Sequence, residues 1–537
     1  MRRFKNLITF ILVLSVILLV GCTTTKECTN HFDNNKDGKC DVCNAPVEII
    51  CTTHNDGDKN GKCDVCGSDV QTQKPEEPKY NFLGAEFIIE VDQAASTDPR
   101  NSNYKGIYQK EKQDLIEAAE KKYNIKIVYK TYPSSASWGG ARERYITENN
   151  IAGTPTAHIY QMPSNSVGTL ATQNAICEVS SYIEKYGNKL AWDKALEFGR
   201  VMGGQYSYSD GYPMSTEGIF YNTGLLAKYL GEERATEPTD LWLEGKWDWN
   251  AFEKICKELD QLLAADEFVL GGMGYNWAYQ MLGANGVHIV DNELQVGVAS
   301  QESIDTLVYM NELFNSVKWD HQSVALSNAT STEMIKGKVA FHNGQTYWIT
   351  NKWTDNQNEP IDFGFVPYPY GPNASNEDGS MNPDKYWIND VYGQTQYVIS
   401  AAYSKELLDP AYWNLKLHDE IIFQIWSELQ YFPEEDPETN EARIEDYTGE
   451  YALTTLEYVY AHEQSIDAHL SVITKGYPDY FYSLDEAKGH VEGSYMLIFQ
   501  SAIVGNPDDI RASMVSLEQK IKTSFKEKFK LSDDFYE

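Results

Sequence analysis

Two short copies of one cysteine and histidine pattern contain the residues whose types and spacing best suit metal chemistry. Each copy reads Cys-x2-His-x8-Cys-x2-Cys, and the copies repeat with a period of 23 residues. The eight residues are Cys28, His31, Cys40 and Cys43 in the first copy, and Cys51, His54, Cys63 and Cys66 in the second. Three thiolates and one imidazole match the ligands of a closed tetrahedral zinc site. The spacing therefore predicts one zinc ion per copy.

A second ligand pattern lies inside each copy. Oxygen-bearing side chains stand at the first, third and fifth positions of a loop with glycine at the sixth, as in EF-hand-like calcium loops. They are Asp33, Asn35 and Asp37 in one copy, and Asp56, Asp58 and Asn60 in the other. Position twelve holds Asn44 or Gly67 instead of the usual bidentate glutamate, which weakens any calcium site.

Three interpretations of the repeats remain open. Zinc is our first choice, because three cysteines cannot all pair as disulfides within one copy. Disulfides among the six cysteines are compatible with an extracellular location. Calcium binding alone, or a polar spacer, is the third. The other two cysteines of the body, Cys177 and Cys256, are expected to be buried free thiols.

The N-terminus has the pattern of a secretion signal rather than a folded element. Arg2, Arg3 and Lys5 precede an apolar run over residues 7–20 that is too short for a comfortable membrane span. The run ends in Leu-Val-Gly before Cys22, which resembles the bacterial lipobox. That resemblance implies cleavage after residue 21, a diacylglycerol on the sulfur of Cys22, and tethering to the outer face of the cell membrane. Residues 22–27 form the lipidated N-terminus, residues 28–66 the repeats, and residues 67–79 a polar linker.

Length and charge limit what the body can be. At 537 residues the chain is expected to form more than one domain. Its formal net charge of −34 argues against electrostatic binding of nucleic acid or of an anionic membrane surface. Tyrosine and tryptophan are abundant, with 36 and 12 residues, and their flat apolar faces with polar tips suit stacking on sugars or peptides.

Apolar patterns alternate between strand and helix along the body. Strands are expected at residues 86–91, 125–129, 218–222 and 390–400, and helices at 109–123, 142–149, 248–263 and 303–315. Asn222 can cap a helix that follows its strand, and Asp248 or Asn250 can cap another. This alternation predicts an α/β fold with a largely parallel sheet and with ligands at the carboxyl ends of the strands.

Several motifs in the body recur together in one known family. The series comprises Tyr-Pro at 212–213, Tyr-Asn at 221–222, Leu-Trp at 241–242, Trp-x-Trp at 247–249, Gly-Lys-Val-Ala at 337–340 and Phe-Val-Pro-Tyr-Pro at 365–369. It resembles the extracellular solute-binding proteins of ABC importers, family 1, the sugar-binding group related to maltose-binding protein. The resemblance covers about residues 80–430. It implies a periplasmic-binding-protein-like type II fold, with two lobes joined by a hinge.

The resemblance also implies lobe boundaries and site residues. Lobe 1 would comprise residues 80–215 and 395–432, and lobe 2 residues 216–394 and 433–537. The first crossing would lie at 213–216 and the return crossing near 392–396. The implied ligand-binding residues are Asp92, Gln161, Ser164, Asn165, Glu217, Trp277, Tyr279, Tyr347 and Trp348. Trp277 and Tyr279 are expected in a glycine-rich loop over residues 271–286, whereas Trp138 and Tyr392 are expected to pack in the core.

The resemblance implies a monomer that binds a carbohydrate, needs no cofactor for doing so, and delivers the sugar to an ABC permease. Catalytic motifs are missing: the sequence has no G-x-S-x-G, no Walker A motif and no H-E-x-x-H. An oligopeptide-binding protein remains the alternative. A lipid-anchored glycoside hydrolase is the third candidate, because such an enzyme needs only two suitably placed carboxylates.

Overall fold

The computed structural model describes Lys39, Lys62 and residues 80–320, 332–346, 362–390, 393–433, 439–487 and 494–537. The chain divides into two units, Met1–Glu77 and Pro78–Glu537, and the fold below is that of the second. The predicted signal peptide, Cys22 and all ligands of the cysteine repeats lie outside the described residues, as do Tyr347, Trp348 and Tyr392.

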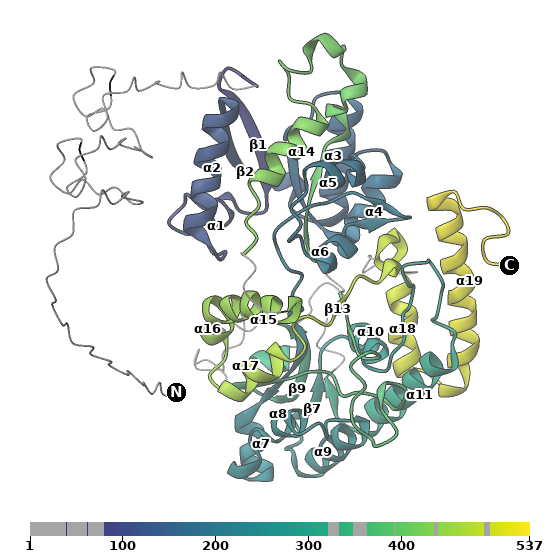
Figure 1. The fold of residues 1–537 in the computed structure, drawn as a ribbon. Coiled ribbons are helices and arrows are strands. Elements are labelled where there is room, and N and C mark those ends of the chain that lie inside the picture. The colour runs from purple at the N-terminus through teal and green to yellow at the C-terminus, as the bar shows by residue number, and fades with distance from the viewer. Residues whose placement is uncertain are drawn as a thin grey trace, which may run out of the picture. The chain divides into compact units, whose positions relative to one another are not determined.

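The first lobe is built on a four-stranded sheet in the order β12-β3-β1-β2 (Figure 1). Its strands are β1 (Ala85–Val91), β2 (Ile125–Thr131), β3 (Ile159–Pro163) and β12 (Thr395–Ile399). Its helices are α1 (Ala94–Thr97), α2 (Gln109–Tyr123), α3 (Gly139–Ile151), α4 (Ser164–Thr172), α5 (Ser180–Tyr186), α6 (Asp193–Phe198) and α14 (Asp419–Glu428). A small hairpin joins β4 (Arg200–Val201) to β5 (Gly204–Gln205).

Helices cover both faces of this sheet. Apolar residues of α2 and α14 share one core cluster with Phe87 and Ile89 of β1, and residues of α3 and α4 share another with Tyr160 and Met162 of β3. The strands β1, β2 and β3 are parallel, so their carboxyl ends lie at one edge of the sheet. Burial on both faces explains why β1 reads as a nearly continuous apolar run.

The second lobe is built on a five-stranded sheet in the order β10-β6-β9-β7-β8. Its strands are β6 (Glu217–Asn222), β7 (Phe268–Gly271), β8 (Trp319–Asp320), β9 (Val339–Gln345) and β10 (Phe363–Val366). Its helices are α7 (Thr223–Leu230), α8 (Glu237–Leu243), α9 (Trp249–Leu262), α10 (Gly274–Ala284), α11 (Gln301–Ser316) and α12 (Thr332–Ile335). The Asn222 side chain accepts a hydrogen bond from the Leu225 amide and caps α7, as predicted, and Asp248 caps α9 through the Ala251 amide.

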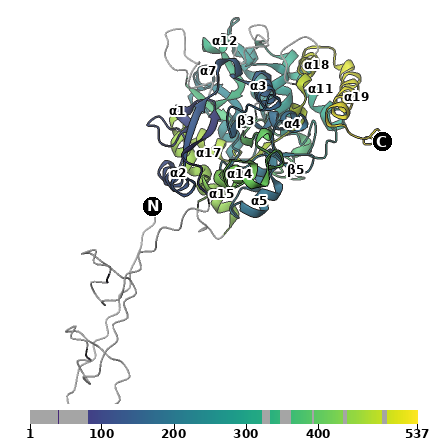
Figure 2. The same cartoon turned by 90° about the horizontal axis from the view of Figure 1, so that it is seen from above.

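The C-terminal part of the chain adds helices to the second lobe. They are α16 (Glu457–Val459), α17 (Glu463–Leu470), α18 (Tyr495–Val504) and α19 (Ile510–Phe529). The preceding helix α15 (Asn440–Tyr451) instead packs Tyr447 into the core cluster of the first lobe. A two-stranded pair joins β11 (Ile388–Asn389) to β13 (Gly476–Tyr477). Helices α18 and α19 pack beside α11, as both Figure 1 and Figure 2 show. In the described part of the chain, no helix combines the length and the hydrophobicity that a membrane span requires.

Two expectations about local structure are wrong. The second sheet is mixed rather than largely parallel, because β6 runs antiparallel to both β9 and β10, whereas the first sheet is largely parallel, with β12 antiparallel to β3. The glycine-rich stretch at 271–286 is mostly the helix α10, which is buried along its whole length. Gly283 sits where the helix meets other backbone: a Cβ at this position would lie 2.7 Å from the Trp387 carbonyl oxygen. The buried free thiols of Cys177 and Cys256 are confirmed.

Candidate ligand-binding site

A cavity that opens among polar and aromatic side chains lies beside the chain's crossing between the two sheets. Its volume is about 470 Å³, within the size range of small-molecule sites. Three segments form most of its wall: the loop after β1, the crossing before β6, and the chain at the start of β12. The polar and aromatic lining residues include Thr97, Tyr104, Lys105, Lys112, Tyr129, Gln161, Asp210, Tyr212, Thr216, Gln394, Tyr397, Trp426, Gln430 and Tyr451.

An ion pair forms the charged part of the cavity wall. Lys112 of α2 lies 2.8 Å from Asp210, and the two side chains are 18% and 11% exposed. Asp210 also accepts a hydrogen bond from the Tyr431 amide at 2.8 Å, which ties the crossing segment to the end of α14. Burial is the largest single effect and would lower the pKa of Lys112, but the negative charge of Asp210 and its hydrogen bond, together with the neighbouring tyrosines Tyr104 and Tyr447, raise that pKa above its ordinary value. The Lys112 ammonium therefore stays charged, and the pair offers both a donor and an acceptor to the cavity.

Tyrosines form the aromatic part of the wall. Burial raises the pKa of Tyr129 on β2 and that of Tyr397 on β12, so both phenols are neutral at physiological pH. Burial also raises the pKa of Tyr212 on the crossing segment to about 12. Neutral phenols combine a flat apolar ring with a hydroxyl that can donate and accept. This combination suits an uncharged ligand that carries both C–H faces and hydroxyl groups.

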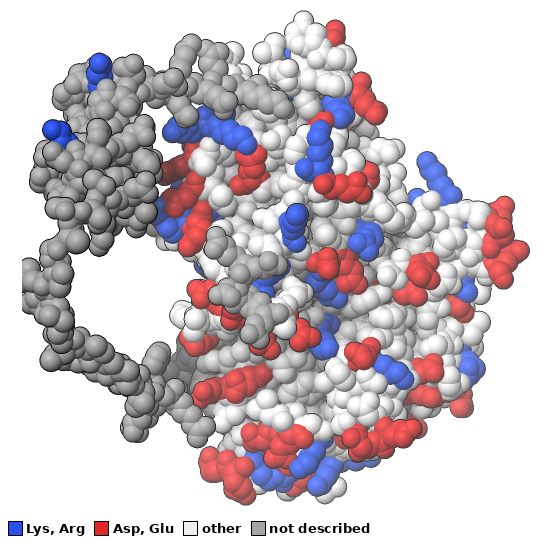
Figure 3. All heavy atoms as spheres, viewed as in Figure 1, with Lys and Arg blue, Asp and Glu red and all other residues white. Residues whose placement is uncertain are grey.

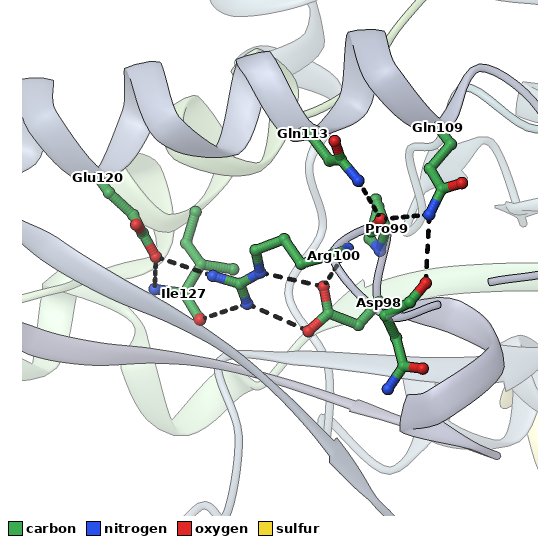
Figure 4. Close-up of polar contacts among 8 residues, drawn as sticks. Asp98, Pro99, Arg100, Gln109, Gln113, Glu120 and Ile127 are labelled. Carbon is green, nitrogen blue, oxygen red and sulfur yellow. Dashed lines mark hydrogen bonds and ion pairs between the residues drawn. The ribbon is translucent and has the colours of Figure 1, made fainter. Parts of the chain in front are cut away.

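The loop after β1 is held against α2 and β2 by a polar network (Figure 4). The guanidinium of Arg100 binds both carboxylate oxygens of Asp98, at 3.1 and 3.2 Å, and donates to the Ile127 carbonyl at 2.8 Å. The side chains of Gln109 and Gln113 both donate to the Pro99 carbonyl, at 2.8 and 2.7 Å. These bonds fix the backbone that carries Thr97 and Tyr104 into the cavity wall, so this wall is formed before any ligand arrives.

One predicted site residue, Gln161, lines the cavity directly. Its side-chain oxygen accepts a hydrogen bond from the Asp92 amide at 2.8 Å, so Asp92 is adjacent to the wall. The Asp92 side chain forms an ion pair with Arg142 of α3 and is 44% exposed. The structure thus brings Asp92 and Gln161 together at the carboxyl edge of the first sheet.

Ser164 and Asn165 lie at the start of α4 and outside this lining. They border a second pocket of only about 20 Å³, together with Asp390. The Ser164 hydroxyl lies 3.3 Å from the Asp390 carboxylate and accepts a hydrogen bond from the Gln394 amide at 3.0 Å. The hydrogen bonds of Ser164 therefore connect α4 to the return crossing.

Glu217 is 3% exposed and begins β6 opposite Gln345 of β9. Burial first, and then the nearby negative charge of Asp390, raises the pKa of Glu217 well above its ordinary value, while the nearby Gln345 side chain acts in the opposite direction. Glu217 does not belong to the lining of the 470 Å³ cavity. A buried carboxyl with a raised pKa is expected to be protonated, so it can donate as well as accept.

The exposure of the aromatic residues differs from what we expected. Trp277 and Tyr279 are both fully buried in the core of the second lobe, where the Trp277 indole donates to the Gly271 carbonyl at 2.8 Å. They point into packed aromatic neighbours because they lie on a buried helix rather than on a loop. Trp138 shows the reverse: we expected it in the core, and it is 53% exposed.

A buried histidine beside the first crossing was not predicted from the sequence. His469 of α17 lies with its Nε2 2.7 Å from the Ser215 carbonyl oxygen and its Nδ1 2.9 Å from the Tyr460 hydroxyl. Since a carbonyl can only accept, Nε2 carries the proton and Nδ1 accepts from Tyr460. Burial lowers the pKa of His469 to about 4, so the ring is neutral. The hydrogen bond from His469 to Ser215 therefore attaches the crossing segment to helix α17, and it requires a single tautomer of the histidine.

Acidic and basic side chains are interspersed over the described surface that faces the viewer in Figure 3. In the described residues, no group of three or more histidine, cysteine, aspartate or glutamate side chains is placed to hold a metal ion. The chemistry of the cavity is accordingly that of one ion pair, several amides and several phenols.

Comparison with known proteins assigns this chain to a family. The family of bacterial extracellular solute-binding proteins matches residues 105–409. No curated protein matches the chain. Among solved structures, the cyclic α-maltosyl-1,6-maltose binding protein of Arthrobacter globiformis is 13% identical, with a TM-score of 0.54 over 83% of this chain and 100% of the other.

Two further solved structures have similar folds. The sugar-binding protein MalE of Xanthomonas citri is 12% identical, with a TM-score of 0.53 over 83% of this chain and 100% of the other. UgpB of Mycobacterium tuberculosis, solved in complex with glycerophosphocholine, is 13% identical, with a TM-score of 0.50 over 83% of this chain and 99% of the other. These likenesses confirm the expected two-lobed fold of the type II sugar-binding proteins. With the family match spanning more than half of its residues, the chain belongs to the bacterial extracellular solute-binding proteins.

Proposed function

We propose that this protein is a lipid-anchored extracellular binding protein that captures an oligosaccharide and delivers it to an ABC importer. The observation that carries the proposal is the lining of the 470 Å³ cavity beside the crossing. Phenol rings, amide side chains and one ion pair meet there, and these are the groups that recognise the apolar faces and the hydroxyls of a sugar.

The polarity of the wall favours a carbohydrate over a peptide. A peptide-binding site satisfies backbone amides and carbonyls along an extended chain, often by strand addition at a sheet edge. Here the Gln161 and Gln430 amides and the Lys112–Asp210 pair converge on one compact space. The similar proteins from Arthrobacter and Xanthomonas, which are a maltosyl-maltose binding protein and a sugar-binding protein, support the same choice. Because UgpB was solved with glycerophosphocholine, a glycerol phosphodiester is the comparison ligand to test.

The two lobes suggest a closing motion. The chain passes from the first sheet to the second before β6 and returns before β12, so we propose crossings at residues 213–216 and 392–396 and the lobe boundaries given above. Ligand contacts to both lobes would favour the closed state. In this proposal Gln161 contacts the ligand, Asp92 is adjacent to it, and Glu217 belongs to the hinge.

The experiment begins with a glycan array on the mature chain, followed by calorimetry with the best glycan, with mixed oligopeptides and with glycerophosphocholine. We expect saturable binding of an oligosaccharide and recovery of that sugar unchanged. Tight binding of peptides without any glycan binding would replace our proposal with the oligopeptide alternative. Release of new reducing ends would indicate a glycoside hydrolase.

We also propose that Cys22 is lipidated and that the cysteine repeats bind zinc. Both proposals rest on the sequence patterns described above. Metal analysis of a fragment covering residues 23–75 tests the second: about two zinc ions per chain are expected from one closed site in each copy. Absence of zinc together with absence of free thiols would favour disulfides.

A further inference from the structure

Trp138 is an exposed aromatic residue at the carboxyl edge of the first sheet. It follows β2, after the short 3-10 turn Ser134–Ala136, and directly precedes α3. Parallel strands β1, β2 and β3 all end at this edge, which is where α/β sheets bind ligands. Slightly more than half of the Trp138 side chain, 53%, is open to solvent.

The backbone beneath Trp138 is held by Arg142, which is itself only 1% exposed. The Arg142 guanidinium donates to the Ala136 carbonyl at 3.3 Å and to the Ser137 carbonyl at 2.5 Å. Its plane lies over the Tyr132 ring at 4.1 Å and reaches the Trp138 ring at 5.6 Å. An indole held by a buried cation and by fixed backbone is ordered before binding, so little conformational entropy opposes its use as a contact surface.

A hydrogen-bond acceptor shares the Arg142 contact with this ring. Asp92 forms an ion pair with the same Arg142 and keeps 44% of its side chain exposed. The amide of Asp92 in turn donates to Gln161, a lining residue of the large cavity. Trp138, Arg142, Asp92 and Gln161 thus form one continuous contact chain that leads from the exposed indole to the cavity wall.

We infer that Trp138 is an aromatic platform for a sugar ring outside the cavity, with the Asp92 carboxylate accepting hydrogen bonds from the hydroxyls of that ring. The ligand is then an oligosaccharide with one end in the cavity and another ring on Trp138. This inference rests on the proposed function and makes it more specific, because it requires a ligand longer than a monosaccharide.

The test measures affinity against chain length. Calorimetry would titrate wild type, Trp138→Ala and Trp138→Phe with the α-1,4-linked series from glucose to maltotetraose, and with the β-1,4-linked glucose and xylose series. For the longest ligand that wild type binds, we expect Trp138→Ala to weaken affinity by about tenfold, since an aromatic contact contributes about that much. The affinity for the shortest ligand bound should stay unchanged, and Trp138→Phe should recover much of the loss.

Trp413→Ala is the matched control, because Trp413 is also exposed, at 37%, but follows the turn Pro410–Tyr412 away from the strand ends. Thermal unfolding should be nearly the same for all variants, since neither indole is in the core. Unchanged affinity of Trp138→Ala for long ligands, or an equal loss for short and long ligands, would overturn the inference alone. Failure of wild type to bind any carbohydrate would overturn the proposed function and this inference with it.

Discussion

Replacing Asp390 with asparagine should change how the stability of the protein depends on pH. Asp390 precedes the return crossing, where Ser164 and Gln394 each lie 3.3 Å from its carboxylate oxygens. Burial raises the pKa of Asp390 to about 6, and the hydrogen bonds from Gln394 and Ser164 offset only part of this effect. The charged carboxylate is therefore less favourable in the folded protein than in the unfolded chain.

The sign of the effect follows from proton linkage. Between pH 4 and pH 6 the folded state holds the Asp390 proton more tightly than the unfolded state, so this group contributes stability at low pH that is lost as pH rises. A difference of about two pKa units, at about 1.36 kcal/mol per unit, amounts to roughly 3 kcal/mol. An asparagine side chain at this position would not titrate; its single oxygen can accept the hydrogen bond from Gln394, and its amide NH2 group can donate to the Ser164 hydroxyl. The variant Asp390→Asn should therefore gain stability relative to wild type by about that amount between pH 4 and pH 7.5.

Urea unfolding at several pH values measures this difference directly. The difference between the free energies of unfolding of Asp390→Asn and wild type should grow from pH 4 to about pH 6 and then stay constant. Asp384→Asn is the control for the removal of one acidic side chain, because Asp384 is an exposed residue of the same connection. A flat curve for Asp390→Asn, or one of opposite slope, would refute the argument from burial.

Three further predictions concern the core, the hinge and the anchor. Trp277→Ala should lower the free energy of unfolding by about 3–5 kcal/mol, because it empties a buried site, and a loss below about 1 kcal/mol in urea unfolding would contradict the observed packing. His469→Leu leaves the Ser215 carbonyl and the Tyr460 hydroxyl without their partner, and should cost about 2 kcal/mol in the same assay; a variant as stable as wild type would show that this contact is dispensable. Cys22→Ser should release the protein from the membrane fraction of lysed cells, whereas continued membrane association would exclude lipidation as the anchor.

Local features of the fold were predictable because they depend on neighbouring residues. The helix predicted at 109–123 is α2 with the same bounds, and the cap at Asn222 forms as expected. Spacing of apolar residues and the chemistry of capping residues suffice for such elements. The buried state of Cys177 and Cys256 followed from the tendency of free cysteines to pack as small apolar side chains.

The site was harder to predict because its contacts are long-range. Trp277 and Trp138 are the same residue type near glycines, yet one is fully buried and the other half exposed. Their exposure differs because Trp277 lies on a buried helix, whereas Trp138 lies at the surface in contact with Arg142. Neither arrangement can be inferred from adjacent residues. His469 is far from Ser215 in sequence, so its contact with the crossing depends entirely on where α17 packs.

The cavity wall formed by the loop after β1 was missed for a related reason. The network around Arg100 links Asp98 with Glu120 and Ile127, which belong to a helix and a strand further along the chain. One sequence signal was present: the loop combines Asp98, Pro99 and Arg100, a compact turn with charges of opposite sign. That signal indicates a fixed turn but not the cavity that the turn borders.

The central claim is that the cavity beside the crossing binds the carbohydrate, and a plugging variant tests it most directly. Thr97 lines the cavity at the end of α1 and is only partly buried, so tryptophan at this position would fill the space with little effect on the core. Calorimetric titration of wild type and Thr97→Trp with the same oligosaccharide is the decisive measurement. We predict stoichiometric binding by wild type and no detectable binding by a folded Thr97→Trp, whereas equal affinities of the two proteins would contradict the claim.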